Sequence, residues 1–204
     1  EYIDYLGDKQ VIQRNARRWL GIVRKYVPQG RLVELGSAYG FFLELAQRSF
    51  DVLGYDVSEE GVRHANDVLQ VRARNEDFIT DTEPAAGSVD VIAMWDVIEH
   101  LPDPQAALRK VWEMLAPSGR LILETQNVTA PFARLMGRRW QHFKQPKHLI
   151  HLNPDTASRH FVMLGKAFPF GVHEIFCNPV GLFKHFRRLS YDIASTEVSR
   201  EELP

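Results

Sequence analysis

The stretch Arg31-Leu-Val-Glu-Leu-Gly-Ser-Ala-Tyr-Gly-Phe-Phe-Leu-Glu-Leu-Ala46 decides the fold of this chain. It begins with a mainly apolar run, Leu32 to Leu35, which is typical of a buried parallel strand. Small residues that let a ligand approach the backbone follow at Gly36, Ala38 and Gly40. After them the pattern predicts a helix, whose first N–H groups have no partner within it. The stretch therefore predicts a ligand site beyond the carboxyl end of a strand.

The spacing of the small residues indicates which ligand binds there. A dinucleotide loop reads G-x-G-x-x-G, whereas here the small residues alternate as G-x-A-x-G after an acidic Glu34. A second apolar strand, Val52 to Tyr55, ends at Asp56, about twenty residues after the loop, where a carboxylate can accept from ribose hydroxyls. The pattern favours a nucleoside without a pyrophosphate. A tight strand-to-helix turn with no ligand is the alternative.

By these residues the chain resembles the class I S-adenosylmethionine-dependent methyltransferases of the small-molecule type, whose first motif reads D/E-x-G-x-G-x-G. Ala38 stands in place of the middle glycine, which leaves the loop geometry there open, because alanine does not enter the region of φ > 0 cheaply. The resemblance implies an α/β Rossmann-like fold, with a doubly wound, mostly parallel sheet and helices on both faces. It implies S-adenosylmethionine as cofactor, S-adenosylhomocysteine as product, and cofactor contacts at Glu34, Gly36, Ala38, Gly40, Asp56, Val57, Asp77, Phe78 and Trp95.

Later stretches carry the same resemblance as far as residue 127. Residues 89–94 form an apolar strand, and Trp95 and Asp96 follow at its carboxyl end, where they could line the methionine end of the site. The next residues, Val97-Ile-Glu-His-Leu-Pro102, are similar to the E-H-L/V-P-D-P stretch of these methyltransferases. Residues 115–124 predict a turn and a fifth strand, and they resemble the family pattern L-K-P-G-G-x-L.

Length and composition favour one globular α/β domain. A chain of 204 residues can bury a good core, so we predict a single domain over 1–204, with a helical segment at 1–29 and an insertion at 127–153. The net charge of −1 argues against nucleic acid as a partner. The single Cys177 fits a reducing compartment, and no apolar run has membrane-spanning length, so we predict a cytoplasmic protein that acts on a small molecule. The oligomeric state stays open.

Helices and strands follow from the remaining patterns. Periodic apolar residues predict helices over 8–27, from an N-cap at Ser58 to about 69, over 104–115 and over 180–193. Short apolar runs predict strands at 71–73 and 172–177. The family closes its sheet with an antiparallel seventh strand, which the pattern does not reveal here. We therefore expect that the chain is truncated or that a helix or a partner finishes the sheet edge.

The insertion at 127–153 is rich in basic residues and histidines, which favours a lid or a substrate-binding wall. Its sequence is similar to methyltransferases of bacterial polysaccharide and other secondary pathways. Crowded like charges are more easily explained if an anion neutralises them, so we predict a small anionic acceptor. A solubilising loop is the alternative. The predicted substrate contacts are Arg138, Arg139, Trp140, Lys144 and His151.

The chemistry follows from the implied cofactor. A sulfonium makes its methyl group strongly electrophilic, so the protein supplies position, orientation and, for an oxygen acceptor, a base. Histidine suits that role because its unperturbed pKa is close to neutrality. We predict His148 as the catalytic base and His100 as the second candidate, followed by His151 and His142. The acceptor atom, oxygen or nitrogen, stays open.

Three alternatives remain at this point. A divalent metal held by Glu99, Asp103 and a histidine of the insertion is conceivable, but no Cys/His cluster has zinc spacing and no metal is predicted. A non-catalytic nucleoside-binding module could share the fold, because a fold does not establish an activity. A nucleotide-dependent oxidoreductase is the third alternative, although it would need the longer glycine spacing.

Overall fold

The computed structural model describes residues 6–140, 148–149, 151, 172–178 and 189–190. It divides into two compact units. The first comprises Glu1–Ala93 and Met114–Gly119, and the second comprises Met94–Glu113 and Arg120–Pro204.

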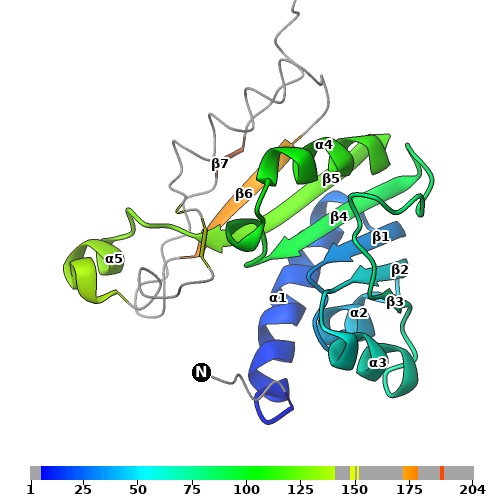
Figure 1. The fold of residues 1–204 in the computed structure, drawn as a ribbon, viewed down its shortest axis with the longest axis horizontal. Helices are drawn as coiled ribbons and strands as arrows, with labels where there is room; N and C mark the ends of the chain where they lie inside the picture. Colours follow the sequence, from blue (N-terminus) through cyan, green and yellow to red (C-terminus); the bar gives the residue numbers. More distant parts are fainter. Residues whose placement is uncertain (1–5, 141–147, 150, 152–171, 179–188, 191–204) are drawn as a thin grey trace, which may run out of the picture. The chain divides into compact units, whose positions relative to one another are not determined.

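Seven strands follow the order β3-β2-β1-β4-β5-β6-β7 along one sheet (Figure 1). The pairs β1–β2, β2–β3 and β5–β6 are parallel, and β7 is antiparallel to β6. The strand order reverses direction after β1, as in a doubly wound α/β sheet, so the predicted fold class is confirmed. The strands are β1 (Gly30–Leu35), β2 (Phe50–Tyr55), β3 (Ala73–Arg74), β4 (Val89–Trp95), β5 (Leu115–Gln126), β6 (Val172–Asn178) and β7 (Leu189–Ser190).

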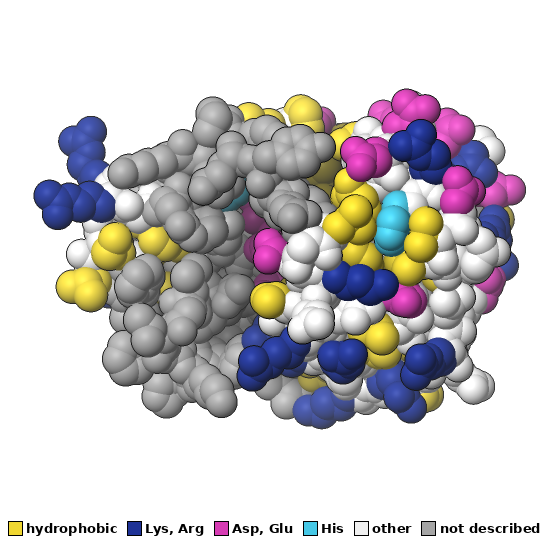
Figure 2. Space-filling model, turned by 90° about the horizontal axis from the view of Figure 1, so that it is seen from below, with side chains coloured by type: hydrophobic (Ala, Val, Ile, Leu, Met, Phe, Trp, Pro, Cys, Tyr) yellow, Lys and Arg dark blue, Asp and Glu magenta, His cyan; other side chains and the backbone are white. Residues whose placement is uncertain are grey.

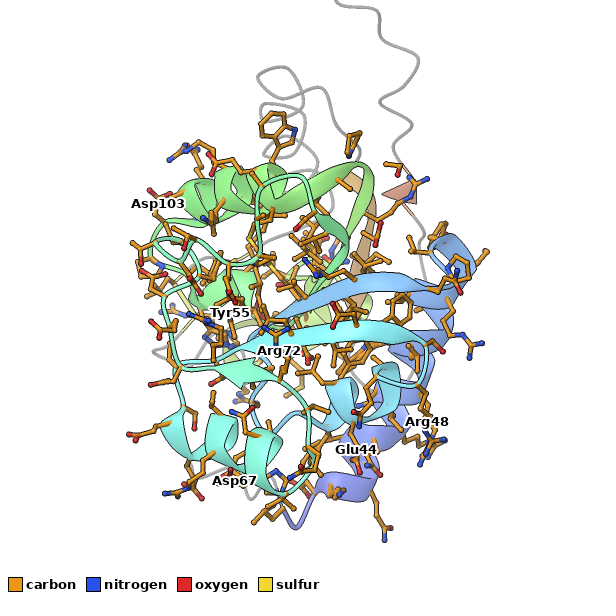
Figure 3. All side chains as sticks on the ribbon, turned by 90° about the vertical axis from the view of Figure 1, so that its right-hand side faces the viewer. Glu44, Arg48, Tyr55, Asp67, Arg72 and Asp103 are labelled. Carbon is orange, nitrogen blue, oxygen red and sulfur yellow. The ribbon has the colours of Figure 1, made fainter. Side chains whose placement is uncertain are left out.

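In the described part of the first unit, three helices lie on one side of β1, β2 and β3 (Figures 1 and 3). They are α1 (Lys9–Tyr26), α2 (Phe41–Ala46) and α3 (Glu59–Asp67). The parallel register pairs Leu32 with Val52 and Leu35 with Tyr55, which brings the carboxyl ends of β1 and β2 together. The predicted N-cap is confirmed, because the Ser58 hydroxyl accepts from the Gly61 N–H at 3.1 Å.

The second unit carries η1 (Ile98–His100), most of α4 (Pro104–Met114), α5 (Pro131–Met136) and η2 (Gly137–Arg139). Helix α4 begins after Asp103, whose carboxylate accepts from the Ala106 N–H at 2.9 Å. Beyond β5, the indole of Trp140 packs into a small apolar cluster with Ala130 and Ala133. Helix α4 confirms the helix predicted at 104–115, and β6 confirms the strand predicted at 172–177.

The structure corrects the prediction at three strands. Strand β5 already begins at Leu115, so the turn predicted before it is part of the extended segment. Strand β3 covers Ala73–Arg74 rather than 71–73. An antiparallel β7 exists at Leu189–Ser190, inside the stretch predicted as a helix. A strand of two residues has too few positions to show an alternating pattern, which is why the sequence did not reveal it.

The exposed face of α1 is basic. Arg14, Arg17 and Arg18 are exposed, whereas Ala16 and Val23 of the same helix are buried. Figure 2 shows Lys and Arg side chains gathered along one edge of the described surface. Among the described helices, none combines the length and the apolar character that a membrane crossing needs.

Candidate functional site

The loop between β1 and α2 folds back onto the end of β2. The N–H groups of Gly36 and Ser37 both donate to the Tyr55 carbonyl, at 2.8 and 3.0 Å. Gly36 and Gly40 have φ angles of 77° and 80°, which glycine adopts without a steric penalty. A Cβ at Gly40 would also lie 2.8 Å from the Ala65 Cβ. The glycines therefore allow both the turn and its close packing.

Ala38 adopts the glycine-like conformation, with a φ of 44°. Its N–H donates to Asp56 Oδ2 at 2.7 Å, and the other carboxylate oxygen accepts from the Ser58 N–H at 2.8 Å. Charge-assisted hydrogen bonds of this kind are strong enough to offset the roughly 1–2 kcal/mol that a left-handed alanine costs. The carboxylate of Asp56 thus holds the loop in the geometry that the middle glycine would otherwise supply.

Asp56 keeps capacity for a ligand. Each carboxylate oxygen has two lone pairs, and each accepts one backbone N–H among the described contacts. The side chain is half-buried at the carboxyl end of β2, directly before Val57, whose side chain is 98% exposed. Asp56 can therefore accept further hydrogen bonds, and its predicted contact with ribose hydroxyls stays a prediction.

Glu34 lies on β1, two residues before Gly36, and only 3% of its surface is exposed. Its Oε2 and the Ser37 hydroxyl have no hydrogen-bond partner among the residues that the structure describes. Burial, and after it the charge of Asp56, raises the pKa of Glu34 well above its ordinary value. Buried polar atoms without protein partners fit a bound polar ligand, so the residues present suit the nucleoside cofactor implied by the motif.

Glu34 makes the stability of the cofactor-free protein pH-dependent. Because its pKa is raised in the folded state, the folded protein holds this proton more tightly than the unfolded chain. The contribution of Glu34 to the free energy of unfolding is fully present below its ordinary pKa near 4.5. That contribution is lost as the pH rises through the folded-state pKa. In the unchanged protein, Glu34 makes the free energy of unfolding fall by at most about 1.4 kcal/mol for each pH unit above 4.5. We expect Glu34→Gln to abolish this fall.

Urea unfolding at several pH values between 5 and 9 measures this slope. Glu113→Gln, which changes an exposed carboxylate of α4, is the matched control. Parallel pH profiles for Glu34→Gln and the unchanged protein would contradict the assignment.

The predicted adenine-side residues lie in the segment after β3. Asp77 is exposed and shapes a turn, because its carboxylate accepts from the Ile79 N–H at 3.0 Å. Phe78 is 9% exposed, and its ring centroid lies 6.4 Å from that of Tyr55. The structure thus gives the pair a turn-forming and a packing role, and their contact with adenine stays a prediction.

The second unit holds a cluster of carboxylates beyond β4. Trp95 is buried at the end of that strand, and Asp96 follows with a φ of 53°, a strained backbone for a residue other than glycine. The Asp96 N–H donates to the Glu124 carbonyl at 2.8 Å. Burial, followed by the charges of Glu99 and Glu124, raises the pKa of Asp96 to about 8, so this carboxyl group holds its proton at neutral pH.

The structure brings the two predicted base candidates together. The rings of His100 and His148 lie 4.7 Å apart, although they are far apart in the sequence. Between their segments, the Leu149 N–H donates to the Glu99 carbonyl at 2.8 Å. The carboxylate of Glu99 is 2% exposed and accepts from the Thr125 hydroxyl at 2.9 Å. Imidazole nitrogens beside a carboxylate are a side-chain combination suited to general acid–base catalysis.

The same cluster could hold a divalent cation. One ligand atom each from Glu99, His100 and His148 lies within 4.8 Å of the others. Asp103, which the sequence-based alternative included, caps α4 instead. Carboxylate and imidazole ligands suit zinc and related metals, so this arrangement can serve either as a proton-transfer site or as a metal site.

The predicted substrate residues differ in their exposure to solvent. Arg138 and Arg139 are exposed on η2, and His151 is exposed with its ring 6.4 Å from His148. Trp140 is 1% exposed inside the apolar cluster beyond β5, which gives it a packing role in the structure. His142 and Lys144 lie outside the described residues.

Sequence reasoning missed Glu124 and Thr125 as members of the cluster. Both are buried at the carboxyl end of β5, and Thr125 donates to Glu99. The sequence does contain a signal for them, because Glu124 and Thr125 directly follow an apolar run. Polar residues in that position lie at the ligand-binding edge of a parallel sheet.

Comparison with known proteins adds independent information. A family model described as a methyltransferase domain matches residues 8–161, which include the loop after β1, Asp56 and the Glu99–His100 pair. The chain is 30% identical over 105 residues to a ubiquinone biosynthesis O-methyltransferase of Psychrobacter cryohalolentis, covering 48% of this chain and 41% of that protein. A protein of the same description from Xanthomonas oryzae pv. oryzae is 30% identical over 131 residues, covering 56% and 55%. The chain spans about half the length of these curated relatives.

Among solved structures, the chain is similar to a SAM-dependent methyltransferase of Thermotoga maritima, described as a possible histamine N-methyltransferase. The TM-score is 0.67 at 17% identity, and the alignment covers 94% of this chain and 90% of that one. At this identity the likeness shows a shared fold.

Proposed function

The chain belongs to the methyltransferase domain family, in the class I S-adenosylmethionine-dependent group, and on that premise we propose that it methylates a small biosynthetic acceptor. The observation that carries the proposal is the loop after β1. Asp56 holds this loop through the Ala38 N–H, and the buried carboxyl group of Glu34 has an oxygen without a partner among the described residues. The chain's similarity to O-methyltransferases supports an oxygen acceptor, with nitrogen as the alternative.

In this proposal the loop after β1 and Asp56 bind and orient the cofactor, S-adenosylmethionine, which supplies an electrophilic methyl group on its sulfonium when bound. Asp56 accepts hydrogen bonds from the ribose hydroxyls, and the loop glycines leave room for the ligand against the backbone. Glu34 offers its buried carboxyl group to a polar group of the ligand. Position and orientation are the main contributions of these residues.

A histidine supplies the base for an oxygen acceptor. His148, whose ring lies 4.7 Å from that of His100, would take the proton from an acceptor hydroxyl, and the bound cofactor would supply the methyl group from its sulfonium, leaving as the neutral thioether. The buried Glu99 next to the imidazoles stabilises the positive charge that the base acquires. An acceptor nitrogen that is already neutral would need this help much less.

The experiment that tests the function has two stages. Thermal shift with S-adenosylmethionine, S-adenosylhomocysteine and NAD(P) identifies the cofactor, and stabilisation by NAD(P) alone would favour the oxidoreductase alternative. Transfer of a labelled methyl group to a panel of phenolic, carboxylate, phosphate-bearing and amine acceptors then separates an enzyme from a non-catalytic binding module. Cofactor binding without transfer to any member of the panel would favour the module.

We further propose that the acceptor is anionic, because Arg138 and Arg139 offer exposed guanidinium groups on η2. The double variant Arg138→Ala/Arg139→Ala is expected to raise the KM of the acceptor roughly tenfold while the affinity for the cofactor stays unchanged. Added salt should act in the same direction, because it screens exposed charges.

Steady-state kinetics at two salt concentrations checks both effects. Arg63→Ala/Arg109→Ala, which removes exposed arginines of α3 and α4, is the matched control. If the KM of the acceptor responds to neither the double variant nor salt, Arg138 and Arg139 have no role in acceptor binding and belong to a solvated loop.

A further inference from the structure

Two neighbouring residues at the end of β2 hold both ends of the segment Asn75–Glu83. At its start, the Asn75 side chain donates from Nδ2 to the Asp56 carbonyl at 2.8 Å. Near its end, the Tyr55 hydroxyl lies 2.8 Å from Asp81 Oδ2 and also reaches the Glu83 carbonyl. Tyr55 is labelled at the end of β2 in Figure 3. The segment is therefore tied to β2 on both sides of Asp77 and Phe78.

The anchor on the Tyr55 side is buried and reinforced by charge. Tyr55 is 2% exposed, and the side chain of Asp81 is 9% exposed. Arg74, which pairs with Tyr55 across the β2–β3 register, places its Nε 2.9 Å from Asp81 Oδ2 and its Nη1 3.3 Å from Glu83 Oε2. Burial, followed by the Asp81 carboxylate, raises the pKa of Tyr55 above its ordinary value, so its hydroxyl remains a donor.

The same tyrosine also supports the middle of the segment. Its ring lies 6.4 Å from that of Phe78 in an edge-on arrangement, and Phe78 is 9% exposed. The backbone N–H of Asp56, the next residue, donates to the Arg74 carbonyl at 3.1 Å. Tyr55 thus connects the carboxylate assigned to the ribose with the pair assigned to the adenine.

We infer that Tyr55 is a positioning residue that sets the segment Asn75–Glu83 for recognition of the cofactor's base. The inference rests on the proposed function, because it needs a nucleoside on Asp56. The hydroxyl of Tyr55 acts through Asp81 and the backbone of the segment and does not touch the reacting atoms. Loss of the Tyr55 hydroxyl therefore lowers the affinity for an adenine nucleoside and narrows the preference for adenine over another base. The rate of methyl transfer at saturating cofactor stays the same.

Tyr55→Phe tests this, because it removes the hydroxyl and keeps the ring against Phe78. Calorimetry with S-adenosylhomocysteine should show an affinity about five- to tenfold weaker, the size of one lost net hydrogen bond or slightly more. S-inosylhomocysteine, which carries hypoxanthine in place of adenine, should lose less, so the preference for adenine narrows. Turnover at saturating cofactor should stay within about twofold of the unchanged protein, as expected when only ground-state binding is lost.

Ser88→Ala is the matched control, because its hydroxyl donates to the Ala85 carbonyl at 2.6 Å on the same connection but outside the anchored segment. This control should leave both affinities unchanged. Equal losses for the two nucleosides in Tyr55→Phe would overturn the inference, since a general weakening of the fold affects both alike. Unchanged affinity, or slower turnover with unchanged affinity, would overturn it as well.

Hydrogen exchange separates this inference from the proposed function. Without any ligand, the amides of residues 75–83 should exchange faster in Tyr55→Phe than in the unchanged protein, because an anchor of the segment is lost. Equal exchange would overturn the inference. If the unchanged protein binds neither nucleoside, the proposed function fails, and the exchange result alone decides whether Tyr55 anchors the segment.

Discussion

A His148→Ala variant is expected to lose about 10²- to 10⁴-fold in turnover while it binds S-adenosylhomocysteine with unchanged affinity. The imidazole lies 4.7 Å from His100 and belongs to the second unit, whereas the cofactor-binding loop and Asp56 belong to the first. Removing the base should therefore slow proton removal and leave ground-state binding of the cofactor in place. The expectation holds for an oxygen acceptor, and a neutral nitrogen acceptor should show a much smaller loss.

Single-turnover methyl transfer and calorimetry on the same preparation measure the two quantities. His151→Ala is the comparison, because His151 is exposed and its ring lies 6.4 Å from that of His148. Its effect on turnover should be smaller. An unaltered rate in His148→Ala would move the role to His100, which His100→Ala tests. If a chelator abolishes turnover and zinc or manganese restores it, the cluster of Glu99, His100 and His148 acts as a metal site instead.

An Asp56→Ala variant is expected to bind S-adenosylhomocysteine about 30- to 150-fold more weakly, which corresponds to about 2–3 kcal/mol for a lost charge-assisted pair of hydrogen bonds. The carboxylate also accepts from the N–H groups of Ala38 and Ser58, at 2.7 and 2.8 Å. Its removal releases the left-handed Ala38 from the contact that holds it. Loss of loop geometry therefore adds to the loss of direct contacts with the ribose.

Asp56→Asn separates the two contributions. An asparagine oxygen can accept a hydrogen bond from one of the two backbone N–H groups, but it carries no charge. The affinity of Asp56→Asn for S-adenosylhomocysteine should therefore lie between those of Asp56→Ala and the unchanged protein. Asp67→Ala, an exposed carboxylate at the end of α3, is the matched control. Unchanged calorimetric affinity in a folded Asp56→Ala protein would remove this residue from the cofactor site.

The sequence by itself determined the strand–loop–helix unit and the order of the elements around it. The apolar run at Leu32–Leu35, the small residues after it and Ser58 as an N-cap are local patterns, and the structure confirms each of them. Parallel strands end at one edge of a sheet, so the position of Asp56 beside the loop followed from its place at the end of an apolar run. Local pattern and chain order were sufficient at these positions because strands and caps follow from neighbouring residues, and a parallel sheet aligns the ends of its strands.

Only the tertiary structure decided how distant groups combine. The N–H of Ala38 finds a carboxylate eighteen positions away in the chain, and this contact, which no local pattern encodes, offsets its left-handed backbone. The rings of His100 and His148 lie 4.7 Å apart, and the residues next to them are joined by a hydrogen bond from the Leu149 N–H to the Glu99 carbonyl. The raised pKa of Glu34 and the link from Tyr55 to Asp81 depend on burial and on non-local contacts. Such contacts form only when the chain closes long loops, and a one-dimensional pattern contains no record of which loops close.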